Sequence, residues 1–306
     1  MAKGFFTQSA MVLFERPVSL EAVAACLDPF DVVKRNEASE APWMGGPSVL
    51  LPMRPEVNGY ALVDLIDRAW PDNMGDPKVD VDLFSAWSMG FFGPLVFPQN
   101  LARAQAMSFT WKGASEIVSR HRAFVRIRSS YALGAADDAP ILPEGVDPVT
   151  ELQYVTTVAR ALLRLPGALA YFNPNGEVLR SCDGLDEELV WCKERDLPPL
   201  PIWTNVRLFR LDSAWSLMDT VGMEQLDVDD HEACFRPDVY EPGAVGRFLR
   251  STSNYIFKSG PVIAPGDTMD GPGGVRWQAH PIAQSLAPRP RRVLRWLPMD
   301  GTVPPR

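Results

Sequence analysis

The chain is short of the side chains on which most catalytic and disulfide-rich folds depend. Its 306 residues include three histidines and four cysteines, and no two cysteines have the C-x-x-C spacing of a zinc or redox site. It also lacks a Walker loop, a G-x-G-x-x-G after a strand, a G-x-S-x-G elbow and an H-E-x-x-H pair. These absences argue against the common enzyme classes and against a disulfide framework. We expect reduced, buried thiols at Cys26, Cys182, Cys192 and Cys234, and no cofactor.

Long hydrophobic runs are missing as well. No apolar segment approaches the roughly 20 residues needed to cross a bilayer. The first residues, MAKGFFTQSAMVLFERP, have no basic segment followed by a continuous apolar run and a small-residue cleavage site. We therefore expect a cytoplasmic protein with no membrane partner.

Basic charge is in deficit. The 30 lysines and arginines are outnumbered by 38 acidic residues, which gives a net charge of −8 and a pI near 5.0. Affinity for a phosphate backbone comes largely from basic side chains, so we expect no nucleic-acid partner. An acidic protein suits a basic partner better. The hydrophobic share of 46% is that of a globular chain, and the length favours two domains.

Segments with strand and helix patterns alternate along the whole sequence. This order predicts an α+β fold made of two mixed α/β modules, with largely antiparallel or mixed sheets, and it is compatible with a duplicated unit. A stretch rich in Gly, Ala, Asp and Pro predicts a linker at 136–148, between modules at 1–135 and 149–306. The aromatic segment 84–97 is expected in the core. Strands are expected at 9–15, 47–53, 121–131, 168–172, 203–211 and 293–297, and helices at 20–27, 57–70, 99–107, 114–120, 149–165, 185–195 and 241–257.

Three arginines share one face of the expected strand at 121–131. Arg122, Arg126 and Arg128 alternate with apolar residues, so they point to the same side of the sheet. One interpretation is a solvated face beside acidic neighbours. The other is a contact with an anion or an acidic partner, because the guanidinium fork suits carboxylate and phosphate groups.

The most site-like stretch is Leu217 to Phe235, LMDTVGMEQLDVDDHEACF, which holds six acidic residues and a histidine. Asp227, Asp229, Asp230 and Glu232 are predicted to cap a short helix and to expose an acidic face to a partner. The alternative is a divalent metal site made by Asp229, Asp230 and His231, which Asp219, Asp267 or Asp270 could complete. A nucleophilic pair of Cys234 with His231 is a third interpretation.

Several segments, in their order along the chain, resemble a known family. HRAFVRIR, ALAYFNPNGEVL, WTNVRLFRL, MDTVGMEQLDVDDHEACF and GDTMDGPGGVRW are similar to an uncharacterised bacterial family of unknown function, catalogued under the number four-two-six-one. The similarity covers about the last two thirds of the chain. Its recognisable parts are the His-Arg-Ala strand, His121 to Ile127, and the Asp-Thr-x-Gly turn, Asp219 to Gly222. No catalytic residues are established for that family, so none is transferred.

Related chains resemble immunity proteins that are encoded beside secreted bacterial toxins, including type VI secretion effectors. The resemblance implies that this protein is not an enzyme but binds and neutralises a cognate toxin, such as a nuclease. An acidic immunity protein can block a basic active-site cleft by complementary charge. Two alternatives stay open: a metal-dependent hydrolase that uses the 227–232 acidic cluster, and an adaptor or chaperone of a secretion system.

Overall fold

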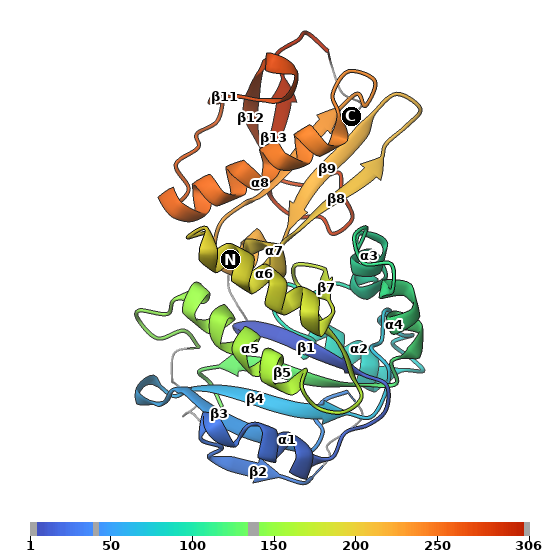
Figure 1. Ribbon diagram of the computed structural model, residues 1–306, viewed down its shortest axis with the longest axis vertical. Helices are drawn as coiled ribbons and strands as arrows, with labels where there is room; N and C mark the ends of the chain where they lie inside the picture. Colours follow the sequence, from blue (N-terminus) through green and yellow to red (C-terminus); the bar gives the residue numbers. More distant parts are fainter. Residues whose placement is uncertain (1–4, 39–42, 134–140, 303–306) are drawn as a thin grey trace. The chain divides into compact units, whose positions relative to one another are not determined.

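The computed structural model describes residues 5–38, 43–133 and 141–302, and it divides the chain into two compact units, Met1–Ile202 and Trp203–Arg306 (Figure 1). The described residues contain eight α-helices and thirteen strands, and the strands form two sheets, one in each unit. This confirms the predicted α+β class with two sheet modules. None of the helices in the described ranges is long and apolar enough to cross a membrane.

The first unit is built on a seven-stranded sheet in which every neighbouring pair is antiparallel. Its order is β2-β3-β4-β5-β1-β6-β7. The central strands β1 and β5 are buried along their whole length, because both faces of the sheet are covered. The strands are β1 (Gln8–Phe14), β2 (Lys34–Asn36), β3 (Ser48–Arg54), β4 (Gly59–Ile66), β5 (Ala123–Ser130), β6 (Ala168–Asn173) and β7 (Val178–Arg180).

Helices cover both faces of this sheet. Helix α5 (Pro148–Leu162) packs against β1 and β5, and α1 (Leu20–Cys26) contacts α5 and β3. Sequence signals explain where both begin, since Asp147 and Ser19 accept hydrogen bonds from the first free backbone amides. The other face holds a core of Trp70, Trp87, Phe92, Phe124 and Phe172, to which α2 (Val81–Ser88), α3 (Asn100–Ala106) and α4 (Ala114–Arg120) contribute. Helices α6 (Cys182–Glu194) and α7 (Leu200–Trp203) follow β7.

The boundary between the units differs from the linker predicted at 136–148. Strand β6 pairs with β1, and β7 pairs with β6, so the chain after that linker completes the first sheet. The first compact unit therefore runs on to Ile202. Residues 136–140 of the predicted linker lie outside the described residues.

The predicted helix at 57–70 is wrong. Residues Gly59–Ile66 form β4, which pairs with β3 on one side and β5 on the other. Ala61 and Val63 are fully buried on one side of the strand, while Asp64 faces the other side and is only 1% exposed. Leu62, Leu65 and Ile66 have the i, i+3, i+4 spacing of a helix, whereas Ala61, Val63 and Leu65 have strand alternation, so the pairing with neighbouring strands decides the outcome.

The second unit contains a six-stranded mixed sheet in the order β11-β12-β13-β10-β9-β8. Strands β10 and β13 run parallel, and the other pairs are antiparallel. Helix α8 (Pro242–Ser259) covers one face, where Val245, Phe248 and Leu249 pack with Trp277 and Trp296. The strands are β8 (Asn205–Arg210), β9 (Ser216–Val221), β10 (Asp230–Phe235), β11 (Thr268–Asp270), β12 (Arg276–Ile282) and β13 (Val293–Pro298).

The segment 283–292, between β12 and β13, lies over the opposite face of this second sheet. Ala287 packs with Leu217 and Cys234, and the backbone amides of Leu286 and Ala287 donate to the Glu232 carboxylate at 2.9 and 3.3 Å. We call residues 283–292 the covering segment. It shields the face of the sheet that carries the charged side chains.

Candidate functional site

The acidic stretch singled out in the sequence forms a strand, a turn and a second strand. Strand β9 ends at Val221 and is followed by Gly222, whose φ of 108° lies in the region that favours glycine. A short 3₁₀ turn, η3 (Met223–Leu226), then leads to β10. The predicted helix with an exposed acidic face is therefore wrong. All six residues of β10 are buried, including Asp230, His231 and Glu232 at 0% exposure. Asp227 is exposed and Asp229 is partly exposed.

Buried charges form a row across four strands of the second sheet. Strand register places Arg207 beside Asp219, Asp219 beside Glu232, and Glu232 beside Arg295. Arg207 Nε donates to Asp219 Oδ1 at 3.0 Å, and Arg295 Nε donates to Glu232 Oε1 at 2.7 Å. Asp219 and Glu232 are thus each neutralised by an arginine on a neighbouring strand.

The covering segment adds two further arginines. Arg291 donates from Nε to Asp230 Oδ2 at 2.9 Å and from Nη2 to Asp219 Oδ2 at 2.7 Å, and Arg289 pairs with Glu224. The second oxygen of Asp230 accepts from Thr220 Oγ1 and from the backbone amide of Met223. Four carboxylates and four guanidinium groups therefore balance inside this unit, and we call them the buried ion network.

The pKa directions differ between two parts of the network. Burial lowers the pKa of Arg291, but Asp230 and Asp219 more than reverse this and raise it above its ordinary value. Burial raises the pKa of Glu224 above its ordinary range despite the attraction of Arg289. Attraction thus outweighs burial at Arg291 but not at Glu224, and the carboxylates of the network are not presented to solvent.

His231 is set apart from this network. Alternation along β10 places its ring on the α8 face, where its Nδ1 accepts from Trp296 Nε1 at 3.2 Å. The indole can only donate, so the neutral ring carries its proton on Nε2, for which the described residues offer no hydrogen-bond acceptor. Burial lowers the pKa of His231 to about 4.

Neither the metal interpretation nor the Cys-His interpretation has supporting geometry. His231 and Asp230 are consecutive in a strand and point to opposite faces, and the same holds for His231 and Cys234, three residues apart. Burial raises the pKa of the Cys234 thiol to about 12, which is the opposite of an activated nucleophile. Across the ranges that the structure describes, no three His, Cys, Asp or Glu side chains are grouped so as to hold a metal ion.

The arginines on β5 bind an anion that belongs to the protein itself. Arg126 donates from Nε to Asp64 Oδ1 at 3.0 Å, and Arg128 donates from Nη2 to the same oxygen at 3.0 Å. Burial raises the pKa of Asp64, but Arg126 and Arg128 outweigh it and hold the pKa below its ordinary value. Arg126 and Arg128 therefore have the predicted acidic neighbour. The predicted solvated face is wrong for these two arginines, because both are buried. Arg122 is exposed and donates to the carbonyls of Ser119 and His121.

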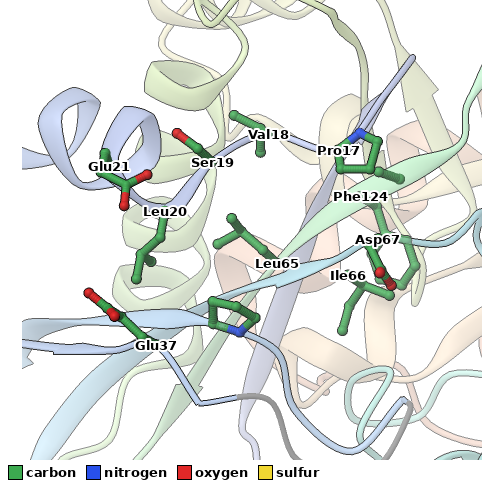
Figure 2. Close-up of a pocket in the computed structure, with 12 residues that line it drawn as sticks. Pro17, Val18, Ser19, Leu20, Glu21, Glu37, Leu65, Ile66, Asp67 and Phe124 are labelled. Atoms are coloured by element: carbon green, nitrogen blue, oxygen red, sulfur yellow. The ribbon is translucent and has the colours of Figure 1, made fainter.

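A pocket of about 450 Å³ opens in the first unit, between the start of α1 and the adjoining ends of β4 and β5 (Figure 2). Leu20 and Leu65 make one side of it apolar, while the side chains of Ile66 and Phe124 belong to the core on the other face of the sheet. Glu21, Glu37 and Asp67 supply carboxylates at its edge, and none of the lining residues is basic. The full lining is Pro17, Val18, Ser19, Leu20, Glu21, Glu37, Pro47, Leu65, Ile66, Asp67, Ala123 and Phe124.

Sequence reasoning did not identify this pocket. Its residues come from five separated stretches of chain that meet only when β4 pairs with β5 and α1 folds back. The sequence did contain one indication that the first unit is the more acidic one, because the excess of acidic residues is uneven along the chain. Residues 203–306 contain twelve acidic and twelve basic residues, so the whole net charge of −8 lies in residues 1–202.

Comparison with known proteins adds one finding. No curated protein and no solved structure matches the chain. Residues 219–297 match the model of a family described as a domain of unknown function (DUF4261). The match runs from β9 to β13, and so includes Asp219, Asp230, Glu232 and the covering segment, while Arg207 on β8 lies outside it. About a quarter of the chain, within the second unit, is thus similar to this uncharacterised family.

Proposed function

We propose that this protein is a cytoplasmic immunity protein that binds a cognate secreted bacterial toxin, such as a type VI secretion effector, and blocks its active site. The observation that supports this best is the separation of the charges. In the second unit, acidic and basic residues are equal in number, and the network neutralises its buried acids. The first unit carries eight more acidic than basic residues. A surplus of one sign on a single unit steers a partner of opposite charge towards that unit.

The buried networks favour recognition over catalysis. The acids and the histidine that would be needed for hydrolysis, Asp230, Glu232 and His231, are at 0% exposure and are packed within the second unit. Of the residues first considered for partner binding, Asp227 and Asp229 remain at the surface. The acidic side chains of the first unit therefore become the main candidates for contact with a basic toxin.

Co-expression with the product of the neighbouring gene, which the proposal expects to be the toxin, is the direct test. We expect the protein to relieve growth arrest in the producing cell and to purify with the toxin as a complex whose affinity falls as salt is raised. If co-expression gives neither a complex nor relief of toxicity, the immunity proposal is wrong.

Calorimetry with Mg²⁺ and Mn²⁺ tests the rival hydrolase. We expect no micromolar binding of either ion, because Asp230 is already paired with Arg291 and hydrogen bonded to Thr220. Micromolar binding that Asp229→Ala and Asp230→Ala abolish would favour the hydrolase over the immunity protein.

A further inference from the structure

We infer that the pocket between α1 and the ends of β4 and β5 receives an arginine side chain of the protein partner. This inference rests on the proposed function, because it names the contact by which the acidic first unit would hold a basic partner. It adds the place of the contact, the type of side chain that enters, and the residues that recognise it.

The inner wall of the pocket suits the aliphatic part of a long side chain. Leu20, which is 9% exposed, and the partly buried Leu65 supply this wall, and both are labelled in Figure 2. Arginine and lysine bury their methylene groups on such surfaces while the charged end stays near water. The volume of about 450 Å³ falls in the range of roughly 300–1,000 Å³ that is common for ligand sites.

The edge of the pocket suits a cation. In Figure 2, Glu21 and Glu37 extend from one side and Asp67 lies on the opposite side, so carboxylates from three separate segments surround the opening. Glu21 stays ionised, because hydrogen bonds from its own backbone amide and from Ser19 lower its pKa. Two arginines lie outside the lining: Arg35 attracts Glu21, and Arg68 is 3.8 Å from Asp67.

The spread of these carboxylates favours arginine over lysine. A guanidinium group has five donors in a planar fork and can bind carboxylates on more than one side. An ammonium group is a compact point charge and would have to sit close to one of them. An apolar side chain would offer these carboxylates no hydrogen-bond donor, and an acidic side chain would be repelled by them. The combination of an apolar wall and an acidic edge therefore selects a side chain that is both long and cationic.

The first experiment uses a small probe and needs no toxin. N-acetyl-arginine amide is titrated into the ¹⁵N-labelled full chain and followed by NMR, with N-acetyl-citrulline amide as the neutral isostere. We expect saturable shifts at the amides of residues 18–21, 65–67 and 123–124 with the arginine probe alone. No saturable shift, or equal shifts with citrulline, would overturn the proposal. Equal or tighter binding of N-acetyl-lysine amide would overturn the choice of arginine.

Variants that alter the charge locate the binding. Glu21→Gln with Asp67→Asn removes two carboxylates from the pocket edge, and we expect affinity for the arginine probe to fall by about five- to tenfold. Glu187→Gln with Glu194→Gln removes the same charge from exposed positions of α6 and should leave affinity unchanged. Equal losses in both variants would mean that net charge, and not the pocket, attracts the probe, which would refute the inference.

The same two variants then separate this inference from the function itself. With the adjacent-gene toxin, the pocket variant should bind more weakly than the α6 variant, with a faster dissociation rate. If the unaltered chain binds the toxin and both variants bind equally, the pocket inference fails while the immunity function stands. If the unaltered chain binds no toxin, the immunity function fails, and with it the assignment of the pocket to this partner.

Discussion

Arg291 donates to Asp219 across 72 residues of chain, with 2.7 Å between Nη2 and Oδ2. This contact fastens the covering segment to β9, on the face of the sheet opposite α8. Arg291 also binds Asp230 on the neighbouring strand, so one guanidinium group connects three parts of the second unit. Both carboxylates are at 0% exposure, which leaves water unable to replace the arginine.

Replacing Arg291 should therefore be costly. Arg291→Met leaves Asp230 buried without its cation, and the loss of one partner from a buried ion pair costs about 3–5 kcal/mol in the free energy of unfolding. Urea unfolding followed by tryptophan fluorescence measures this. Arg292→Met is the matched control, because Arg292 is the next residue and pairs with Asp229 at the surface. It should cost less than about 1 kcal/mol, and equal losses would contradict a special role for the network.

Stability should fall in mild acid because of His231. Its pKa in the folded protein is about 4, against 6.5 for an ordinary histidine, so the unfolded chain takes up a proton first as the pH is lowered. The free energy of unfolding should decrease between about pH 6.5 and pH 4, by up to about 3 kcal/mol from this residue. His231→Gln keeps an acceptor for Trp296 but cannot titrate. The difference in the free energy of unfolding between the unaltered protein and His231→Gln should therefore change with pH. Parallel pH profiles of the two proteins would contradict the prediction.

Asp64 should also lose its stabilising effect in acid, but at a lower pH than His231. Its folded pKa lies below the ordinary value of 3.8, so its stabilisation is fully present above that value and is lost as the pH falls through the folded pKa. At neutral pH, Asp64→Asn leaves Arg126 and Arg128 buried without a counter-charge, and we expect a loss of about 3–5 kcal/mol. Asp67→Asn, three residues later and exposed, should stay within about 1 kcal/mol. A similar effect of both substitutions on urea unfolding would contradict the assigned ion pairs.

Thiol labelling should separate the four cysteines into two classes. Burial raises the pKa of Cys192 to about 11 and that of Cys234 to about 12, and both are at most 2% exposed. Iodoacetamide at pH 8 should therefore label the half-buried Cys26 and Cys182 first. Peptide mass spectrometry should find the other two labelled only after unfolding. Rapid labelling of Cys234 in the native protein would restore the nucleophile interpretation.

Local sequence patterns predicted most of the elements. The helix at 149–165 follows from its apolar spacing, and the structure has α5 at Pro148–Leu162, begun by an aspartate cap. The strand at 121–131 follows from alternation and appears as β5 at Ala123–Ser130. Each of these two patterns lies within one continuous segment, so each element can be predicted without knowing which distant residues it contacts.

Long-range pairing could not be predicted in the same way. Asp64 lies within the segment predicted as a helix at 57–70, yet it is the counter-ion of two arginines more than 60 residues away. Asp230 and Glu232 looked like a surface cluster because their arginines, Arg291 and Arg295, lie near the C-terminus of the chain. Acidic residues at short spacing have the same appearance whether they face solvent or a distant guanidinium group.

The hairpin of β8 and β9 has a practical consequence for dissecting the second unit. Arg207 on β8 is the direct partner of Asp219, but the family match begins at Asp219 itself. A fragment cloned to the matched ends, 219–297, would have an acidic residue at its first position and would lack an edge strand. Such a fragment would hold four buried carboxylates and three of their four arginines. Expression boundaries should instead begin at or before Trp203, so that every charge inside the unit keeps its counterpart.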